Sequence, residues 1–474
     1  MTGSLERIIA ASGISFGTSG ARGLVSDFSD DVVAAFTQSF LRVMQAEFAV
    51  QRIAIGIDNR PSSPAMAAAC SGAAQALGIA VDYYGVLPTP ALAYQALEDK
   101  VPAIMVTGSH IPFDRNGLKF YRPTGEITKA DELAIVSTSA ELTSFTGALP
   151  AANAKAATNY IKRYTDVFSP GILQGLHIGL YEHSSAGRDL YADFFRQLGA
   201  EVTSLERTDT FVPIDTEAVA EADVQKGLAW SKDYGFDAIF STDGDGDRPL
   251  IADETGTWLR GDIVGLLCAR ALGIEALAVP VSCNTAIEKS GVFSAVTRTR
   301  IGSPYVIAAL EALAPQYGSV AGFEANGGFL LGSDVELNGQ LLKALPTRDA
   351  LLPGIALFAA AANTKLSQQV ASLPARFTAS DRIQNIPTEK SKTLIADATQ
   401  DCSSLMNKLD MSSRQVETTN TTDGLRINFG DGDIIHLRPS GNAPELRCYA
   451  EASNQNAAAA LVKQVLGTLR TQLQ

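Results

Sequence analysis

Four short polar loops, in a fixed order along the chain, carry the side chains best suited to chemistry. They are Thr107-Gly-Ser-His-Ile-Pro112, Asp243-Gly-Asp-Gly-Asp-Arg248, Gly322-Phe-Glu-Ala-Asn-Gly-Gly328 and Arg438-Pro-Ser-Gly-Asn-Ala-Pro444. The first offers a hydroxyl nucleophile beside an imidazole, the second three carboxylates for a hard cation, the third groups that bind hydroxyls, and the fourth a cradle for phosphate. Together they predict a site for phosphoryl transfer, which no single loop would support.

The first loop supplies a candidate nucleophile. Gly108 leaves room for a substrate beside Ser109, and the imidazole of His110 titrates near neutral pH, so it can orient a phosphate or move a proton. An ordinary loop with a helix-capping serine fits the isolated hexapeptide equally well. Lys119, further along, can accept a proton from a sugar hydroxyl if it is partly desolvated, although a lone lysine is more often a solvated surface charge.

The second loop predicts a metal site. Asp243, Asp245 and Asp247 alternate with glycines, so their carboxylates can converge around one ion. Oxygen ligands select Mg²⁺ or Ca²⁺, and three negative charges this close repel one another unless a cation is present. A calcium-binding EF-hand would also use Glu254, but it needs glycine where this chain has Arg248 and helices where strands are expected. Arg248 instead places a cation beside the metal loop, where it can bind phosphate.

The third and fourth loops carry candidate substrate contacts. Glu324 and Asn326 lie among small residues and can hydrogen-bond to the vicinal hydroxyls of a ring. A fork-shaped cation, a hydroxyl, an open backbone and an amide match a phosphate dianion, and in the last loop these are Arg438, Ser440, Gly441 and Asn442. Taken alone, each segment is also compatible with an ordinary polar turn.

Strands and helices alternate along the chain, which predicts α/β layers. Apolar strands are expected at Arg52–Asp58, Ile79–Tyr84, Leu176–Tyr181, Ala200–Thr203, Ala276–Val281 and Ala295–Thr299, with one of the helices from about Ala186 to Leu198. Three more strands lead directly into the polar loops, at Pro102–Thr107, Asp237–Ser241 and Ser319–Phe323. Because binding loops in α/β folds lie at strand ends, the first three loops are expected to face one cleft.

Length and composition indicate a well-packed protein of several domains. The chain has 474 residues, which is more than one hydrophobic core usually supports. Hydrophobic residues make up 46% of it and charged residues 19%, the balance of a well-packed protein. Its net charge of -13 disfavours nucleic acid and anionic membranes as partners, so an anionic substrate must be captured by local basic residues.

Cysteine usage and the apolar segments indicate a cytoplasmic protein. The five cysteines are scattered, which argues against a disulfide framework and a zinc site. The first residues show no secretory signal pattern. The most apolar stretch, Leu351–Ala362, contains Pro353 and is shorter than the roughly 20 residues that span a bilayer, so it predicts a buried helix.

The ordered set of loops resembles the α-D-phosphohexomutase family, and more closely its phosphomannomutase members, over essentially the whole chain. The resemblance implies a phosphoserine at Ser109 with His110 beside it, Arg22 near it in the early segment Gly17–Gly23, and Lys119 as general acid or base. It implies Mg²⁺ ligands at Ser109, Asp243, Asp245 and Asp247. The implied substrate contacts are Arg248, Glu324, Asn326, Arg438, Ser440, Gly441 and Asn442.

The same resemblance implies an architecture and an activity. It implies an α/β fold of four domains around a central cleft: three related α/β domains at 1–150, 151–257 and 258–372, and a smaller C-terminal α+β domain at 373–474. The implied reaction is reversible exchange between a hexose 6-phosphate and a hexose 1-phosphate, mannose preferred, with hexose 1,6-bisphosphate as intermediate and activator. A monomer or weak dimer that binds small sugar phosphates is expected.

Departures from the family pattern leave the substrate open. The sugar loop of the family often reads Gly-Glu-x-Ser-Gly followed by histidine, whereas this chain has Phe323, Asn326 and Gly328 for the first glycine, the serine and the histidine. Asn442-Ala443 stands where Thr-Glu is frequent. A phosphoglucomutase, an N-acetylhexosamine phosphate mutase and a non-catalytic, metal-dependent sugar-phosphate-binding protein remain alternatives.

Overall fold

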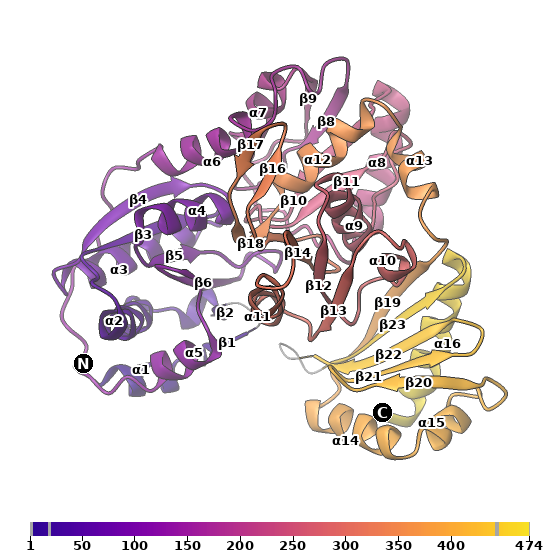
Figure 1. Ribbon diagram of the computed structural model, residues 1–474. Coiled ribbons are helices and arrows are strands. Elements are labelled where there is room, and N and C mark those ends of the chain that lie inside the picture. Colours follow the sequence, from indigo (N-terminus) through magenta and orange to yellow (C-terminus); the bar gives the residue numbers. More distant parts are fainter. Residues whose placement is uncertain (1–2, 18–19, 441–444, 474) are drawn as a thin grey trace.

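In the part of the chain that the structure describes, each of the four large β-sheets is formed by one continuous stretch of sequence (Figure 1). The computed structural model describes residues 3–17, 20–440 and 445–473. The first three sheets mix parallel and antiparallel strands, and the last is antiparallel throughout. This arrangement confirms the expected α/β fold with a smaller α+β part at the C-terminus.

The first sheet has the order β1-β2-β6-β5-β3-β4, with β7 paired to β6. Its strands are β1 (Ser15–Phe16), β2 (Ala21–Leu24), β3 (Arg52–Ile57), β4 (Ala80–Val86), β5 (Ala103–Val106), β6 (Arg115–Arg122) and β7 (Gly125–Glu126). The helices of this part are α1 (Leu5–Ala11), α2 (Asp30–Glu47), α3 (Ser63–Gln75), α4 (Thr89–Asp99) and α5 (Lys129–Val136), with a 3₁₀ turn at Val25–Asp27. β3 and β5 are buried apolar runs, as strands covered on both faces require.

The second and third sheets have the orders β11-β10-β8-β9 and β13-β12-β14-β15-β18. The second contains β8 (His177–Tyr181), β9 (Glu201–Leu205), β10 (Ala238–Thr242) and β11 (Pro249–Ala252), with helices α6 (Lys155–Thr165), α7 (Tyr191–Gln197) and α8 (Glu221–Tyr234). The third contains β12 (Ala276–Pro280), β13 (Ala295–Thr299), β14 (Val320–Phe323), β15 (Phe329–Leu331) and β18 (Leu345–Asp349), with α9 (Gly261–Ala271), α10 (Ala286–Lys289), α11 (Ser303–Leu313), α12 (Leu351–Ala361) and α13 (Leu366–Ala371). A small hairpin pairs β16 (Val335–Leu337) with β17 (Gln340–Leu342).

The first three polar loops occupy equivalent positions in these sheets. In each sheet one strand runs parallel to a neighbour and then turns into an antiparallel partner: β5 into β6, β10 into β11, and β14 into β15. These three turns correspond to the serine loop (107–112), the aspartate loop (243–248) and the sugar loop (322–328). The three sheets therefore share the strand-to-loop layout that the sequence predicted.

The C-terminal sheet has the order β19-β23-β22-β21-β20. It contains β19 (Phe377–Gln384), β20 (Val416–Asn420), β21 (Leu425–Phe429), β22 (Ile434–Pro439) and β23 (Glu445–Ala452), with helices α14 (Thr388–Gln400), α15 (Cys402–Lys408) and α16 (Gln455–Leu473). The fourth polar loop joins β22 to β23, so it also connects two adjacent antiparallel strands.

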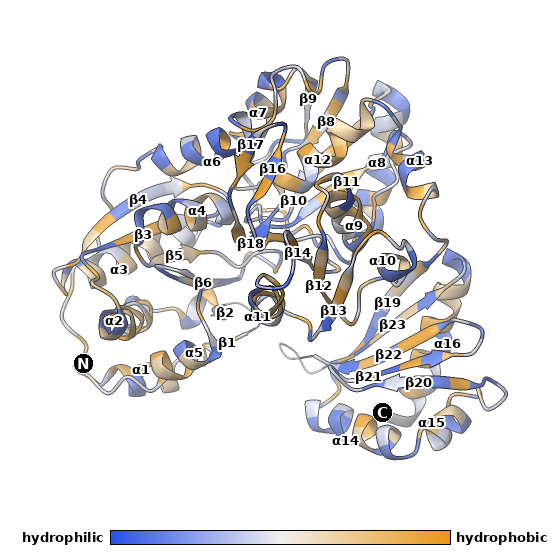
Figure 2. Ribbon diagram, in the orientation of Figure 1, coloured by the Kyte–Doolittle hydropathy of each residue, from blue (hydrophilic) through white to orange (hydrophobic). Residues whose placement is uncertain are grey.

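Apolar packing joins the first three sheets more closely than it joins the fourth. One cluster of buried hydrophobic residues includes side chains from all three, whereas the C-terminal part has a separate cluster between its sheet and its helices. Figure 2 shows hydrophobic positions along strands of all four sheets. Polar contacts link the C-terminal part to the third sheet: Asn284 Nδ2 donates to the Arg376 carbonyl at 2.8 Å, and Thr285 N donates to Glu451 at 3.0 Å. The exact domain boundaries at 150, 257 and 372 stay a prediction.

The expected elements were found with one notable difference. The strands match the predicted ranges to within two residues, and α12 is buried as expected. The helix expected from Ala186 begins only at Tyr191. Ala186 N instead donates to the carbonyl of Gly244 at 2.9 Å, so the segment before α7 packs against the aspartate loop. Among the described residues, no helix is long and apolar enough to cross a membrane.

Buried His183 makes the stability of the second part depend on pH. Burial lowers its pKa to about 4, although Nε2 hydrogen-bonds to the Thr242 carbonyl at 2.9 Å. As the pH falls below about 6.5, the unfolded chain binds a proton that the folded one does not, so the free energy of unfolding should decrease by about 3 kcal/mol by pH 4. His183→Asn keeps a donor and tolerates the φ of 31°, and it should show a shallower decline in urea unfolding between about pH 7 and pH 5. Equal slopes would contradict this.

Candidate active site

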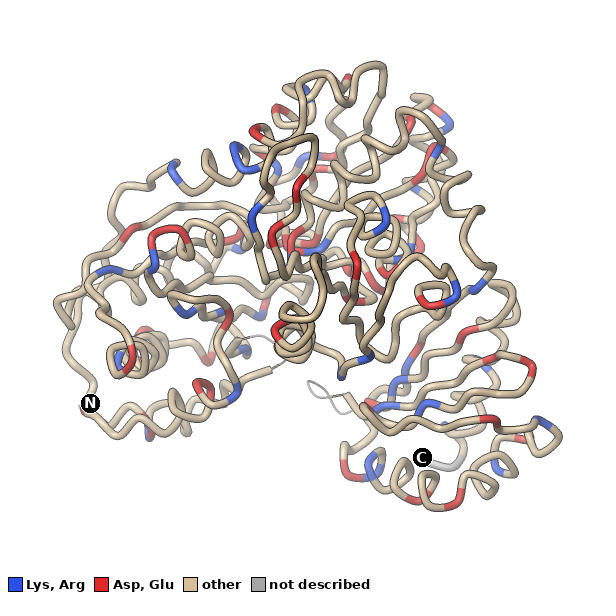
Figure 3. Tube along the Cα trace, in the orientation of Figure 1, with Lys and Arg blue, Asp and Glu red and all other residues tan. Residues whose placement is uncertain are grey.

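Side chains from the first three polar loops converge at the centre of the molecule. Ser109 Oγ donates a hydrogen bond to Asp243 Oδ2 at 2.7 Å, although the two residues lie in loops that follow strands of different sheets. Lys119, on β6, places Nζ 2.6 Å from Asp245 Oδ2 and 2.7 Å from Asp247 Oδ2. Acidic and basic positions accordingly lie side by side there (Figure 3). The nucleophile and the aspartate triplet therefore face each other.

The backbone holds Ser109 in a conformation that few residues adopt. Its φ is 55°, in the left-handed region, which costs about 1 kcal/mol or more for a residue with a side chain. Thr107 Oγ1 accepts a hydrogen bond from Ser109 N at 2.8 Å and donates to Asp58 Oδ2 at 2.7 Å. Ser109 is fully buried in this conformation. The tight turn aims the hydroxyl at the second sheet.

Arg60 organises the serine loop, and the sequence reasoning missed it. Its guanidinium donates to the carbonyls of Ser109 (2.8 Å), Ile111 (2.6 Å) and Pro112 (2.7 Å), and pairs with Asp58 at 3.1 Å. A Cβ at Gly108 would lie 2.6 Å from the guanidinium carbon, so glycine there admits the arginine. The available signal was Asp58-Asn-Arg60 at the end of a buried strand, where binding residues of α/β folds concentrate.

Replacing Arg60 by methionine is expected to lower kcat/KM about 100-fold, because displacing a catalytic group by about 1 Å costs that much. Arg60→Lys should recover little, since one ammonium cannot replace a fork that donates to four carbonyls, the fourth being that of Arg115 at 3.0 Å. The matched control is Arg163→Met, another buried arginine, which donates to the Lys343 carbonyl. Steady-state kinetics of the three variants measure the loss of kcat/KM, and thermal unfolding measures their loss of stability. Equal losses of kcat/KM in both methionine variants would argue against a role for Arg60 in positioning the serine.

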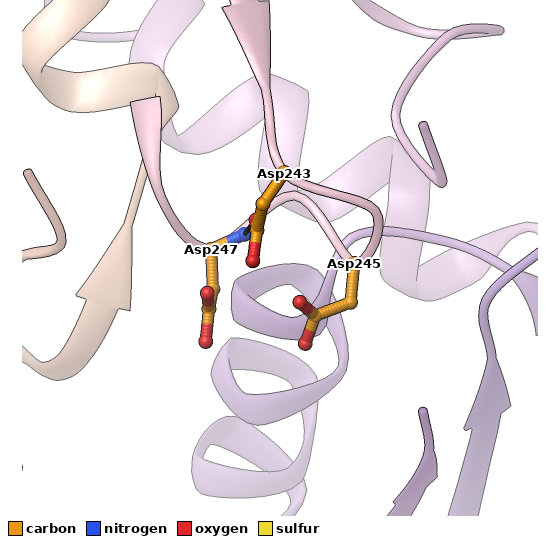
Figure 4. Close-up of side chains that lie close together, drawn as sticks. All are labelled: Asp243, Asp245 and Asp247. Carbon is orange, nitrogen blue, oxygen red and sulfur yellow. Dashed lines mark hydrogen bonds between the residues drawn. The ribbon is translucent and has the colours of Figure 1, made fainter. Parts of the chain in front are cut away.

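The aspartate triplet has the chemistry of a hard-cation site. One oxygen from each of Asp243, Asp245 and Asp247 lies within 4.8 Å of the others (Figure 4). Burial and the neighbouring carboxylates raise the pKa of Asp243. Among the described residues, Oδ1 of Asp245 and Oδ1 of Asp247 are buried without a hydrogen-bond partner. These oxygen-only donors fit Mg²⁺.

The EF-hand alternative is wrong. The aspartate loop joins strands β10 and β11 rather than two helices. Glu254, which would be the twelfth residue of such a loop, accepts a hydrogen bond from Ser367 N at 3.2 Å, so its carboxylate binds the segment at α13. The triplet and Glu254 therefore do not form one calcium loop.

His110 is a neutral imidazole in this site. Burial, and next the positive charge of Arg248, lower its pKa to about 3. Arg248 Nη1 lies 2.9 Å from His110 Nδ1, and because arginine only donates, Nδ1 is the acceptor and the proton resides on Nε2. Ser109 Oγ is 3.4 Å from the same Nδ1. His110 thus bridges the nucleophile and Arg248.

Three arginines surround the carboxylates. Burial, and next Arg248, lower the pKa of Arg22 to about 10, and its Nε and Nη2 have no hydrogen-bond partner among the described residues. Arg248 Nε lies 3.6 Å from Asp247 Oδ1, and Arg348 Nη1 lies 3.7 Å from Asp247 Oδ2. Buried donors without partners, in electrostatic contact with the aspartate triplet, are suited to a phosphate group. Arg348 was not among the residues that the sequence predicted.

The sugar loop reaches the same place. Glu324 is buried and accepts a hydrogen bond from Arg348 Nε. Asn326 Oδ1 accepts from Gly328 N at 3.0 Å, and its backbone carbonyl accepts from Thr216 Oγ1 at 2.7 Å. The side-chain oxygen of Asn326 therefore stabilises its own loop, and Glu324 is the carboxylate directed at the arginine.

The fourth loop is described only in part. Arg438 Nε lies 2.9 Å from Asp423 Oδ2, and this carboxyl oxygen also accepts from Ile301 N at 3.0 Å, across the contact with the third sheet. Ser440 is buried, and its N donates to the Glu445 carbonyl at 3.0 Å. The other two predicted phosphate contacts, Gly441 and Asn442, lie outside the described residues.

Comparison with known proteins places the chain in one family. Family models match it at residues 13–145 (phosphoglucomutase/phosphomannomutase, alpha/beta/alpha domain I), 260–377 (domain III) and 369–468 (C-terminal domain). It is 57% identical to a phosphomannomutase of Salmonella muenchen over 98% of both chains, and 44% identical to one of Sinorhizobium fredii over 97% of this chain and 100% of the relative. A crystal structure of a phosphoglucomutase/phosphomannomutase family protein from Burkholderia thailandensis matches the fold with a TM-score of 0.75 at 19% identity, over 96% of this chain and 97% of that one. The chain belongs to the phosphoglucomutase/phosphomannomutase family, the α-D-phosphohexomutases.

Proposed function

We propose that this protein is a phosphomannomutase that interconverts mannose 6-phosphate and mannose 1-phosphate through a phosphate carried on Ser109. The observation that supports this most directly is the 2.7 Å hydrogen bond from Ser109 Oγ to Asp243, within the aspartate triplet. Two relatives named phosphomannomutase, at 57% and 44% identity, align with this chain over nearly their full length. Hexose 1,6-bisphosphate is the proposed intermediate and activator, and the cytoplasm the proposed location.

Transfer in the proposed mechanism exchanges one phosphorus–oxygen bond for another. The bond from phosphorus to Ser109 Oγ breaks as a hydroxyl oxygen of the sugar bonds to the same phosphorus, and the hydroxyl proton passes to Lys119. The bisphosphate then reorients, and in the reverse step Lys119 returns a proton to the departing sugar oxygen while Ser109 Oγ takes the other phosphate. Water must be excluded during reorientation, because it would hydrolyse the phosphoserine.

Lys119 is protonated in this arrangement. Burial alone would lower its pKa, but the carboxylates of Asp245 and Asp247 outweigh that effect and raise it. Ser109 Oγ is a free hydroxyl in this arrangement, so the ammonium group corresponds to the stage after the first transfer, when Lys119 holds the hydroxyl proton and can donate it to the departing sugar oxygen. In the first transfer Lys119 must be neutral, because an ammonium group has no lone pair to accept a proton. Asp243, Asp245 and Asp247, with Ser109, would hold Mg²⁺, which when bound neutralises charge on the transferring phosphoryl group.

The remaining residues orient the substrate in this proposal. Arg22 and Arg248 bind the reacting phosphate, with neutral His110 fixing Arg248. The sugar loop contributes Glu324 and Asn326 to the ring hydroxyls. The phosphate that is not reacting is held by Arg438, Ser440, Gly441 and Asn442.

A coupled assay tests the substrate directly. Mannose, glucose, glucosamine and N-acetylglucosamine phosphates are compared at the same concentrations of Mg²⁺ and bisphosphate, and mannose phosphate should give the highest kcat/KM. Intact mass after incubation with hexose bisphosphate should show one phosphate on Ser109. A protein that binds sugar phosphates but shows neither exchange nor this adduct would be a binding protein, and the proposal would fail.

A further inference from the structure

Arg348 is a buried arginine that connects the sugar loop to the aspartate loop. It lies on β18, and its side chain is 3% exposed. Nε donates to Glu324 Oε2, and Nη1 lies 3.7 Å from Asp247 Oδ2. One rigid guanidinium thus contacts the carboxylate of the sugar loop and one carboxylate of the metal triplet.

Arg348 also borders a small cavity next to Lys119. This cavity is lined by Gly20, Lys119 and Tyr121 from the first part of the chain and by Pro304, on α11, and Arg348, on β18. Lys119 Nζ binds Asp247 from the other side, at 2.7 Å. The arginine and the proposed proton carrier are therefore held by the same aspartate, on facing elements of two different sheets.

Gly328 provides the room that Arg348 occupies. A Cβ at Gly328 would lie 2.6 Å from Cδ and 2.8 Å from Cγ of Arg348, closer than real side chains approach. The φ of Gly328 is not in the left-handed region, so glycine is required here by the lack of space for a side chain and not by the backbone conformation. Gly328 is also the position where the sugar loop of the family often carries histidine. The arginine and the glycine therefore form a matched pair.

Glu324 cannot rotate freely while this contact persists. A buried, charge-assisted hydrogen bond to Oε2 holds that oxygen in place and so restricts rotation of the carboxylate. Hexose epimers differ only in the direction of one ring hydroxyl, so a carboxylate with a fixed direction distinguishes them, and a rotating one accommodates both. The orientation of Glu324 is thus the feature on which discrimination depends.

We propose that Arg348 is a specificity-determining positioning residue: through the space left by Gly328 it orients Glu324 against the metal triplet, and so sets the preference between hexose phosphate epimers. This inference rests on the proposed mutase function. It predicts that removing the guanidinium weakens selection of the epimer more than it weakens phosphoryl transfer.

The test measures kcat and KM of wild type, Arg348→Met and Arg348→Lys with mannose 1-phosphate and glucose 1-phosphate, at saturating Mg²⁺ and bisphosphate. In Arg348→Met the ratio of the two kcat/KM values should fall about 10-fold or more, chiefly through a higher KM for the preferred epimer. Arg348→Lys should lie between, because it keeps the charge and loses the fork. Ser109 should still acquire phosphate from bisphosphate, as measured by intact mass.

A second variant displaces the arginine without removing it. Gly328→Ala should lower the same ratio, whereas Gly179→Ala should not, although its Cβ would meet the ring of Phe236 at 2.7 Å, a similar crowding in the second sheet. Arg376→Met is the control for loss of a buried ion pair, since Arg376 Nε lies 2.5 Å from Glu451 Oε1 in the C-terminal part. Both controls should lower the melting temperature and keep the wild-type ratio.

The outcomes separate this inference from the proposed function. A wild-type protein without exchange activity on any hexose phosphate would refute the function and the inference together. An active wild type, with Arg348→Met retaining its epimer ratio, would overturn the inference alone. An unchanged ratio in Gly328→Ala would overturn the claim that the glycine makes room for the arginine, and an equal change in the control variants would reduce Arg348 to a structural role.

Discussion

Ser109→Ala is expected to abolish phosphate exchange, with a loss in kcat of at least about 10⁴-fold, because the variant has no oxygen to carry the phosphoryl group. Binding of the sugar phosphate should remain measurable by calorimetry, since the arginines and the sugar loop are unchanged. Intact mass after incubation with hexose bisphosphate should show no adduct. The loss of the hydrogen bond to Asp243 affects one buried carboxylate and should leave the fold intact.

A second serine provides the control for this experiment. Ser241 is equally buried on β10, where its Oγ donates to the Tyr181 carbonyl at 2.8 Å. Ser241→Ala should therefore lose one hydrogen bond and retain turnover. Wild-type turnover in Ser109→Ala would refute the covalent mechanism, whatever the control shows.

The second large effect concerns the metal. Asp245→Asn should lower kcat/KM about 10³-fold, because an amide is a weaker ligand and the charge that holds Lys119 is reduced. Mg²⁺ at about 100 times its dissociation constant should raise the free energy of unfolding of wild type by about 2.7 kcal/mol, and this gain should nearly vanish in the variant. Thermal unfolding with EDTA and with Mg²⁺ measures the gain independently of turnover.

Asp253 supplies the matched control. It is a buried aspartate after β11, and its Oδ1 accepts hydrogen bonds from Thr255 N at 2.9 Å and Thr257 N at 3.1 Å. Asp253→Asn should lose stability in EDTA and in Mg²⁺ alike, and keep the difference between them. If Asp245→Asn retained the full stabilisation by Mg²⁺, the triplet would not be the metal site.

Local patterns predicted the strands and the loops they lead into. Apolar runs such as Asp237–Ser241 end in polar, glycine-rich turns, and strand ends are where α/β folds place binding residues. The predicted start of α7 was wrong because Ala186 N donates to a carbonyl of the aspartate loop, a partner distant in sequence. Helix propensity reflects local sequence and contains no information on such contacts.

Arg60 and Arg348 escaped the sequence analysis for a related reason. Neither lies in one of the four polar loops identified from the sequence, and a single arginine outside such a motif is usually interpreted as a surface charge. Their importance depends on burial and on partners from other segments: the carbonyls around Ser109 for the first, and Glu324 for the second. Gly328 was noticed as a departure from the family pattern, but only the structure shows that its missing side chain makes room for Arg348.

The sequence by itself determined the class of chemistry, because the hydroxyl, the three carboxylates and the phosphate-binding groups are properties of residue types and short spacings. Tertiary structure alone decided how these groups act on one another. It placed Lys119 between Asp245 and Asp247, kept His110 neutral beside Arg248, and put Arg348 against Glu324. The physical reason is that charge, protonation and orientation depend on burial and on neighbours from other sheets, which meet only when the chain has folded.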